Sequence, residues 1–293
     1  MIVSTIIAIA LNDPLYPALL KEIFDPPDPL YVSGNANLLN FSPLLAVVGS
    51  RKSSAYGKQA IDRLLTPLVK NGVPLVSGLA YGVDSIAHNL CLSYHTPTIA
   101  VLGSGLDDAS IYPRLHIKLA NAIIKDGGVI ISEYPNGTAP LQFHFPARNR
   151  IIAGLTMATL VVQAAARSGS LITARLALEY GRDVAAVPGA ITDTLSAGTN
   201  QLIQQGATPL LTPEDAFALL NIDPIVTASN HNTAVLTDLQ KIVLGAMSST
   251  PLHVDQLVSI TSLPSPILSV TLTELELLDV IEHLGGMRYT RKG

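Results

Sequence analysis

Short apolar runs, each followed by a glycine- or serine-rich turn and a helical stretch, repeat along the chain from about residue 44 to residue 220. These runs are continuous and do not alternate with polar positions, which is typical of strands covered by helices on both faces. Because strands and helices alternate at this spacing, the pattern predicts an α/β fold with a doubly wound, mostly parallel sheet. The predicted strands are Leu44–Val48, Val73–Ser77, Thr98–Leu102, Val129–Ser132, Thr159–Val162, Val184–Val187 and, more weakly, Thr208–Leu211.

The pattern changes after residue 220. Residues 221–233 (NIDPIVTASNHNT) are rich in turn formers and have little periodicity, so we predict a linker. Residues 234–293 then predict a small separate domain, because three helices followed by a hairpin is the order of a winged helix-turn-helix. The predicted elements are helices Val235–Met247, Val254–Ile260 and Ile267–Leu278 and a hairpin at Gly285-Gly286.

The N-terminal part of the chain is too short and too broken for a domain of its own. Five prolines lie between Pro14 and Pro29. We therefore divide the chain into a remnant N-terminal segment (1–43), a Rossmann-like domain (44–220), the linker (221–233) and a winged-helix-like domain (234–293).

Composition supports deep burial without a membrane. The chain has 293 residues, of which 48% are hydrophobic and 14% charged, and its mean hydropathy is +0.40. The longest apolar run, Ile151–Ala166, contains Gln163 and is shorter than the roughly 20 residues that span a bilayer. The N-terminus lacks the features of a signal peptide, and the single cysteine, Cys91, cannot form an internal disulfide. We therefore expect a cytoplasmic protein without membrane insertion.

The formal net charge of −4 argues against nucleic-acid binding, but its distribution does not. Residues 45–217 carry 13 basic and 11 acidic residues, a net charge of +2, whereas each flank carries −3. The third helix predicted in the C-terminal domain contains Glu274 and Glu276 and no basic residue, so it would repel a phosphate backbone. We interpret that domain as a packing or protein-interaction module.

Four glycine- and serine-rich turns follow predicted strands: Gly49–Ser54, Ser77–Gly82, Gly103–Asp107 and Arg167–Ser170. The carboxyl ends of parallel strands meet at one edge of the sheet, where helix N-termini present backbone N–H groups to anions. Guanidinium groups beside such N–H groups suit a polyphosphate backbone. The arginines nearby are Arg51, Arg114, Arg148, Arg150 and Arg167, and the aromatic residues that could stack on bases or pack in the core are Tyr112, Tyr134, Phe143 and Phe145.

Several familiar sites are excluded by failed motif matches. Gly103 and Gly105 open like a dinucleotide fingerprint, but Asp108 occupies the third glycine position. The stretch from Gly49 to Lys58 has the wrong spacing for a Walker A loop. The histidines lack metal-ligand spacing, and no G-x-S-x-G motif precedes a predicted helix. We therefore predict no cofactor and no metal, and nucleophilic hydrolysis has no support.

The motifs of this chain resemble those of the DNA processing protein A (DprA, also called Smf) family over residues 12–290. The matching segments are VGSR (Val48–Arg51), SGLAYGVD (Ser77–Asp84), LGSGLD (Leu102–Asp107), Tyr112-Pro113, SEYP (Ser132–Pro135), FPARNRIIAGL (Phe145–Leu155), RSGSLITA (Arg167–Ala174), Pro188-Gly189, SAGTN (Ser196–Asn200) and Gly206-Ala207. Two departures are a shortened N-terminal domain and His116, which stands where many members have Asn.

The resemblance implies an extended Rossmann-like fold that binds single-stranded DNA without catalysis. It also implies loading of the RecA recombinase onto incoming DNA during natural transformation (competence) and DNA recombination, and it implies a homodimer. The DNA-contacting positions that carry over are Gly49, Ser50, Arg51, Gly78, Arg114, Arg148, Asn149, Arg150, Ser168, Gly169 and Ser170.

Two other hypotheses remain open. The first is an enzyme acting on a nucleotide or nucleoside phosphate, because related enzymes share Pro188-Gly189. Here, however, Ala190 follows, and the Thr-x-x-Glu part of their motif is missing. Release of free base from AMP would support this alternative. The second is a scaffold whose acidic C-terminal domain recruits partners.

Overall fold

The computed structural model of the chain describes residues 6–224, 236–247, 251–278 and 280–291. By its internal contacts the chain divides into two compact units, Met1–Ile225 and Val226–Gly293. The predicted linker, 221–233, falls mostly outside the described residues. Within the described ranges, no helix has the length and apolar character needed to cross a bilayer.

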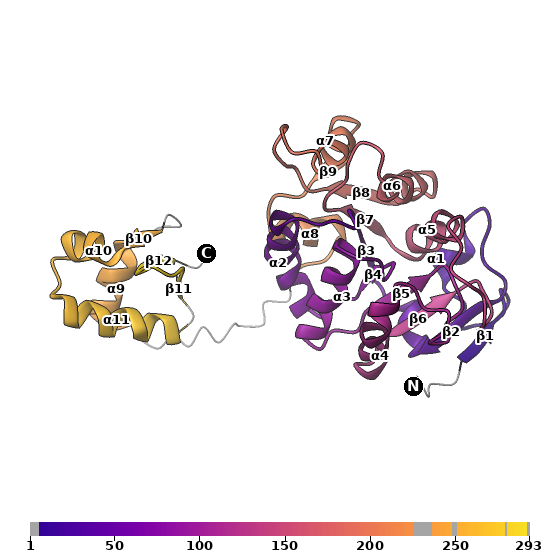
Figure 1. The fold of residues 1–293 in the computed structure, drawn as a ribbon, viewed down its shortest axis with the longest axis horizontal. Coiled ribbons are helices and arrows are strands. Elements are labelled where there is room, and N and C mark those ends of the chain that lie inside the picture. Colours follow the sequence, from indigo (N-terminus) through magenta and orange to yellow (C-terminus); the bar gives the residue numbers. More distant parts are fainter. Residues whose placement is uncertain (1–5, 225–235, 248–250, 279, 292–293) are drawn as a thin grey trace. The chain divides into compact units, whose positions relative to one another are not determined.

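Unit 1 is built on a nine-stranded sheet with the order β1-β2-β6-β5-β4-β3-β7-β8-β9 (Figure 1). Neighbouring strands from β6 to β9 are parallel, whereas β1 pairs with β2, and β2 with β6, in antiparallel register. The strands are β1 (Ile6–Ile9), β2 (Leu30–Gly34), β3 (Leu45–Val48), β4 (Leu75–Ser77), β5 (Ile99–Leu102), β6 (Val129–Ser132), β7 (Ala158–Val161), β8 (Asp183–Ala186) and β9 (Thr208–Pro209).

Each strand predicted from the sequence is present, within two residues at either end, as β3 to β9. The structure adds two strands at the N-terminus. Residues Leu30–Gly34 form β2, which lies beside β6 and pairs Tyr31 with Ser132. The N-terminal segment, which we expected to be a remnant, thus extends the sheet of unit 1. The sequence pattern did not predict its strands because the prolines between β1 and β2 interrupt the pattern.

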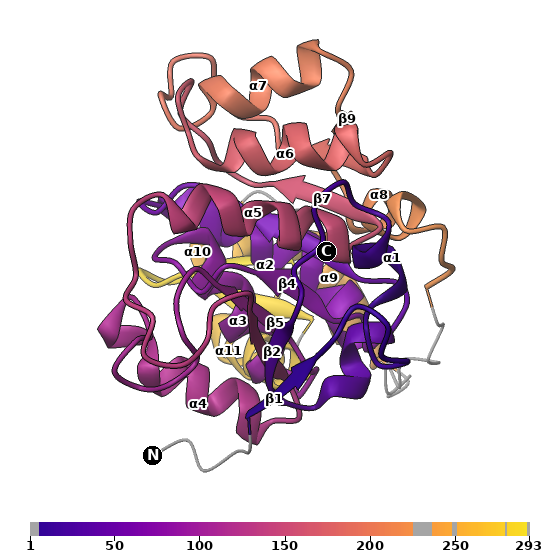
Figure 2. The same cartoon turned by 90° about the vertical axis from the view of Figure 1, so that its right-hand side faces the viewer.

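Helices cover both faces of the sheet, as a doubly wound fold requires. One face packs against α2, α3, α4 and α8, and the opposite face packs against α1, α5 and α6. Helices α5 and α6 also pack against each other, side by side in Figure 2. The helices are α1 (Ala18–Lys21), α2 (Ala55–Lys70), α3 (Val83–Ser93), α4 (Ile117–Lys125), α5 (His144–Leu155), α6 (Ser170–Glu179), α7 (Ala197–Gln204) and α8 (Pro213–Leu219), with 3-10 turns η1 (Ala36–Asn40) and η2 (Arg114–His116).

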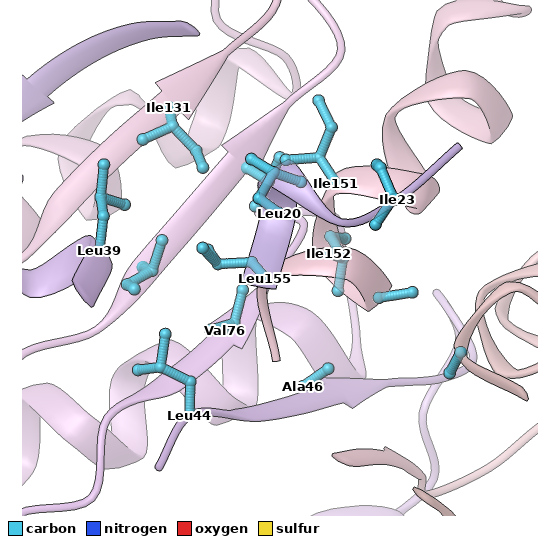
Figure 3. Packing of buried hydrophobic residues seen from close by; sticks show 14 of the residues in the cluster. Leu20, Ile23, Leu39, Leu44, Ala46, Val76, Ile131, Ile151, Ile152 and Leu155 are labelled. Carbon is cyan, nitrogen blue, oxygen red and sulfur yellow. The ribbon is translucent and has the colours of Figure 1, made fainter. Parts of the chain in front are cut away.

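Helix α5 packs on the sheet through the hydrophobic cluster that it shares with α1 and α6. Ile151, Ile152 and Leu155 are at most 1% exposed and face the strands, while Leu20 and Ile23 of the N-terminal segment close over them (Figure 3). Full burial of each such side chain contributes about 1.5–3 kcal/mol to folding. This packing fixes the position of the helix that carries Arg148, Asn149 and Arg150.

Unit 2 has the order of a winged helix, with a third short strand added to the predicted hairpin. Its described elements are α9 (Asp238–Gly245), β10 (Leu252–His253), α10 (Val254–Thr261), α11 (Ser265–Leu277), β11 (Ile281–His283) and β12 (Arg288–Arg291). The sheet order is β10-β12-β11. Val235, where we predicted the start of the first helix, and residues 248–250 lie outside the described residues. In α11, Glu274 accepts a hydrogen bond from the Gln240 side chain at 2.9 Å, so this acid joins α11 to α9.

A fully buried histidine lies within α3 of unit 1. His88 Nδ1 is 2.9 Å from Thr98 Oγ1, and Thr98 in turn donates to the Leu75 carbonyl at 2.7 Å. The histidine therefore carries its proton on Nδ1, because Thr98 uses its own hydrogen for Leu75. Its Nε2 has no hydrogen-bond partner among the described residues, and burial lowers the pKa of His88 to about 3.

We predict that His88 makes the protein sensitive to acid. Between pH 6.5 and about 3 the unfolded chain binds one more proton at this residue than the folded chain, so stability is lost as the pH falls through that window. From pH 7 to pH 4.5 the loss should be about 2.5 kcal/mol. Denaturant unfolding across this range should show a shallower pH dependence for His88→Gln. The exposed His95→Gln is the control, and equal pH dependence of His88→Gln and the wild type would refute the prediction.

Candidate functional site

A cavity of about 560 Å³ lies at the carboxyl ends of β3 and β7. These two parallel strands are neighbours at the centre of the sheet, and the chain leaves them in opposite directions, to β4 on one side and to β8 on the other. Ligands of open α/β sheets bind at such a switch point because two loops separate there. The cavity is lined by the turn after β3, the turn before α6, the first part of α3, residues 142–152 and Tyr112.

The turn after β3 brings Gly49, Ser50 and Arg51 to one wall of the cavity. Arg51 is exposed, and its guanidinium carbon lies 5.4 Å from the centre of the Phe145 ring. The Phe145 and Tyr112 rings are 5.6 Å apart, and both line the cavity. An exposed guanidinium beside two aromatic rings can contact a phosphate while the rings stack on a base.

The opposite wall is the turn before α6. Ser168 and Ser170 share a hydrogen bond of 2.8 Å between their hydroxyls, and the side chain of Asn149 donates to the Gly169 carbonyl at 3.3 Å. Arg167, at the start of this turn, is exposed and also lines the cavity. Helix α6 begins here, and the N–H groups of Ser170, Leu171 and Ile172 are bonded within the turn, so the turn places the positive end of the helix dipole beside the arginine.

The inner wall contains a buried charge. Arg148 is 4% exposed, and its Nη1 donates to the carbonyls of Gly78 and Val101. Burial lowers the pKa of Arg148 to about 10, and the nearby Asp84 opposes that shift. Gly78 has no room for a side chain, because an added Cβ would collide with this guanidinium.

Asp84 is the counter-charge on α3. It is 7% exposed and accepts hydrogen bonds from the backbone N–H groups of Gly78 at 3.1 Å and Ala80 at 3.3 Å. Burial raises the pKa of its carboxyl, and Arg148 counteracts that rise. Asp84 and Arg148 together therefore hold the turn after β4 in one conformation.

Two expected parts of the surface are occupied by the protein itself. The turn Gly103–Asp107 is covered by residues 134–145: Gly105 N donates to the Thr138 carbonyl at 3.0 Å, and His144 packs over Gly103. Arg150 forms two 2.8 Å hydrogen bonds to the Glu133 carboxylate and a 3.3 Å ion pair with Asp25. This arginine therefore connects α5 to the N-terminal segment.

The cavity thus brings together most of the residues that the sequence singled out. Gly78 lines a smaller hollow that shares Arg51 and Arg148 with the cavity, and Arg114 directly follows Pro113 of that hollow and is exposed. Arg150 lines neither hollow. The predicted residues on the cavity wall are Gly49, Ser50, Arg51, Arg148, Asn149, Ser168, Gly169 and Ser170.

Two positions that hold the turns beside the cavity escaped the sequence analysis. Asp84 appeared there only as part of a motif, although an acid in the first turn of a helix after a glycine-rich turn is a usable signal. Gln163 appeared only as an interruption of an apolar run, yet it is 0% exposed and bonded to the turn after β3. Among the described residues there is no group of three or more His, Cys, Asp or Glu that could hold a metal ion.

Comparison with protein families gives two matches. The family described as DNA recombination-mediator protein A matches residues 7–221, and the DprA winged helix domain matches residues 227–287. The DNA processing protein DprA of Streptococcus pneumoniae is 46% identical over 209 residues, which cover 71% of this chain and 72% of that protein. Protein Smf of Synechocystis is 36% identical over an alignment that covers 96% of this chain and 79% of its own.

Solved structures agree with the sequence matches. The crystal structure of DprA from Streptococcus pneumoniae superposes with a TM-score of 0.68 at 44% identity, covering 73% of this chain and 74% of that one. DNA processing protein A from Helicobacter pylori, whose structure concerns its single-stranded DNA binding mode, superposes with a TM-score of 0.67 at 32% identity, covering 75% of this chain and 97% of that one.

We predict that Asp84→Ala destabilises the protein by about 3 kcal/mol, because it leaves the buried Gly78 N–H and the half-buried Ala80 N–H without an acceptor and the Arg148 charge without compensation. Asp84→Asn keeps an acceptor oxygen of the same shape and should lose about half as much. Urea unfolding monitored by circular dichroism measures both. Equal stability of Asp84→Ala and the wild type would show that the pair does not hold the turn.

Proposed function

The chain belongs to the DNA recombination-mediator protein A family, and from that premise we propose that it binds single-stranded DNA without catalysing a reaction. The observation that carries the proposal is the position of the exposed Arg51, at the mouth of the switch-point cavity and against the Phe145 ring. The structural relative from Helicobacter pylori, described by its single-stranded DNA binding mode, supports the same choice.

We assign the DNA contacts to the exposed and backbone groups of the site. Arg51 and Arg114 would bind phosphates, and the turn Ser168–Ser170, with Asn149 beside it, would present N–H and hydroxyl groups to the same strand. Gly49 and Ser50 would position Arg51 and not contact DNA themselves, because a Cβ at Gly49 would collide with Val83 and the Gln163 carbonyl, and Ser50 N is bonded to that carbonyl. Phosphate contacts of this kind are independent of sequence and weaken steeply with salt.

Arg148 and Arg150 have a different role in this proposal. Both were expected to contact DNA, but Arg148 is bonded to two backbone carbonyls and Arg150 to Glu133. We therefore assign them to holding the walls of the cavity, with Gly78 providing the space for the Arg148 guanidinium. The exposed cations at the edge of the cavity, Arg51 and Arg114, then make the direct contacts to DNA.

The lining of the cavity favours binding over chemistry. Of the described residues on its wall, Asp84 is the one carboxylate, and it is buried and bonded to two backbone N–H groups. A general base must be able to reach a substrate proton, and a carboxylate in this position is directed at the protein backbone. This supports a non-catalytic role.

The proposal extends to the biological process. We propose that the protein loads the RecA recombinase onto incoming DNA in natural transformation and recombination, acts as a homodimer and works in the cytoplasm, where the recombinase is. The support is membership of the family together with the division of the chain into two compact units, the second of which carries net negative charge. A DNA-bound sheet domain and a separate protein-binding domain suit a loading factor.

We predict that Arg51→Glu/Arg114→Glu weakens binding to a fluorescent oligothymidylate by about 100-fold at 0.1 M salt. The plot of log Kd against log salt should also become shallower by about 1.4, because two phosphate contacts are lost at about 0.7 each. Fluorescence anisotropy measures both. The control is Lys70→Glu/Lys125→Glu, which changes the net charge equally at the C-terminal ends of α2 and α4, on the far edge of the sheet. Equal losses in the two double variants would refute a localised site.

We also predict that unit 2 contributes little to DNA affinity. A chain ending at Pro224 should bind the same oligonucleotide within about threefold of the full chain, because unit 2 carries net negative charge and would gain no favourable phosphate contacts through α11. A loss of tenfold or more would place part of the DNA site in unit 2.

A further inference from the structure

The turn between β3 and α2 determines where Arg51 can reach. It runs from Gly49 to Ser54, and Arg51 and Lys52 in its middle are exposed. An exposed turn with two long cationic side chains would sample many conformations unless something fixed its ends, and ordering it on binding would reduce affinity. The structure shows what fixes both ends.

Gln163 bonds to the turn at both ends. It lies just beyond β7, on the other side of the switch point, and its backbone carbonyl accepts from Ser50 N at 2.7 Å. Its side-chain Oε1 accepts from Ser54 N at 2.9 Å and from the Ser53 hydroxyl at 3.1 Å. Its Nε2 donates to Ser54 Oγ at 2.9 Å. The side chain is 0% exposed, so water does not compete for these bonds.

The same amide also acts on the start of α2. Ser54 caps this helix, and its Oγ accepts from Gly57 N at 3.4 Å while it accepts from Gln163. Gly57 has no room for a side chain, because an added Cβ would collide with Gln163 Oε1 and Ser53 Oγ. One buried amide thus fixes the end of the turn, the helix cap and the spacing between β7 and α2.

We propose that Gln163 is a positioning residue for single-stranded DNA binding. It holds the Gly49–Ser54 turn so that Arg51 faces the bound DNA. The inference rests on the proposed function of this site and assigns it a residue that does not itself touch DNA. It also explains why a polar side chain lies in an otherwise apolar run, since its partners are 109 and 110 residues away in the sequence.

Two substitutions separate hydrogen bonding from packing. Gln163→Met keeps the length and the burial but removes every side-chain hydrogen bond. Gln163→Glu keeps the acceptor oxygen, and the rotatable Ser54 hydroxyl can donate to its second oxygen, so three donors satisfy the carboxylate. We expect Gln163→Met to weaken oligothymidylate binding about fivefold and Gln163→Glu by less than about twofold. Gly57→Ala displaces the amide from the helix side and should reproduce the effect of Gln163→Met.

A double-mutant cycle shows whether Gln163 acts through Arg51. Arg51→Ala should weaken binding about tenfold, and Arg51→Ala/Gln163→Met should bind within about twofold of Arg51→Ala alone, because the residue being positioned is gone. The fold losses of affinity caused by Arg114→Ala and by Gln163→Met should instead multiply when the two substitutions are combined. All variants are compared at a temperature where circular dichroism shows them folded. Multiplicative effects with Arg51→Ala, or unchanged affinity of Gln163→Met, would overturn the proposal.

Hydrogen exchange separates this proposal from the proposed function. Gln163→Met should speed exchange of the Ser54 amide at least tenfold in the protein without DNA, and Gln163→Glu should preserve its protection. The Ser50 amide, bonded to the backbone carbonyl of residue 163, is the internal reference because neither substitution removes that carbonyl. If Arg51→Ala binds like the wild type, the assignment of Arg51 as a DNA contact is wrong, and the exchange result alone decides whether Gln163 fixes the turn. Unchanged exchange in Gln163→Met would overturn the positioning role.

Discussion

The site depends on one constraint: parallel strands end at the same edge of a sheet, and the chain must leave the two central strands in opposite directions. Here β3 and β7 are those strands, and the turns that follow them form opposite walls of one cavity. Helix N-termini and exposed arginines therefore face a common space as a direct result of the strand order. The remaining features of the site keep this space open and keep its walls in place.

Buried polar groups provide that support. The Arg148 guanidinium lies beneath the cavity, where it joins α5 to the backbone after β4 and within β5, and Asp84 balances its charge from α3. A buried charge without a partner would be costly, so the pair constrains the relative positions of α3, α5 and the strands between them. Arg150 does the same at the outer side of α5, through Glu133 and Asp25. Charges that hold the walls are therefore distinct from charges that are free to meet a ligand.

The difference between buried and exposed charges marks the limit of what the sequence alone could predict. The period and turn chemistry of the apolar runs predicted the parallel strands, and the order of strands and turns placed Arg51 and the turn Ser168–Ser170 at one edge. Arg148 and Arg150 looked like further rim cations because a sequence gives the spacing of charges and not their burial. The turn Gly103–Asp107 looked open because the segment that covers it, residues 134–145, has no regular pattern. The strands β1 and β2 were missed because the five prolines between them break the apolar pattern; β1 pairs only with β2, and β2 in turn pairs with β6.

Buried polar residues were the positions that were hardest to interpret from the sequence. His88 and Gln163 are both fully buried, and each interrupts an apolar environment. His88 bonds to Thr98 inside the packing between α3 and the sheet, which makes it part of the core, whereas Gln163 bonds to the turn that carries Arg51. The two residues differ in the role of their partners. The partner of Gln163 is determined by the pairing of β3 with β7, which places the end of β7 beside the turn after β3. A polar residue at the end of a strand next to a switch point is therefore better interpreted as a support for the neighbouring turn than as a defect in a strand.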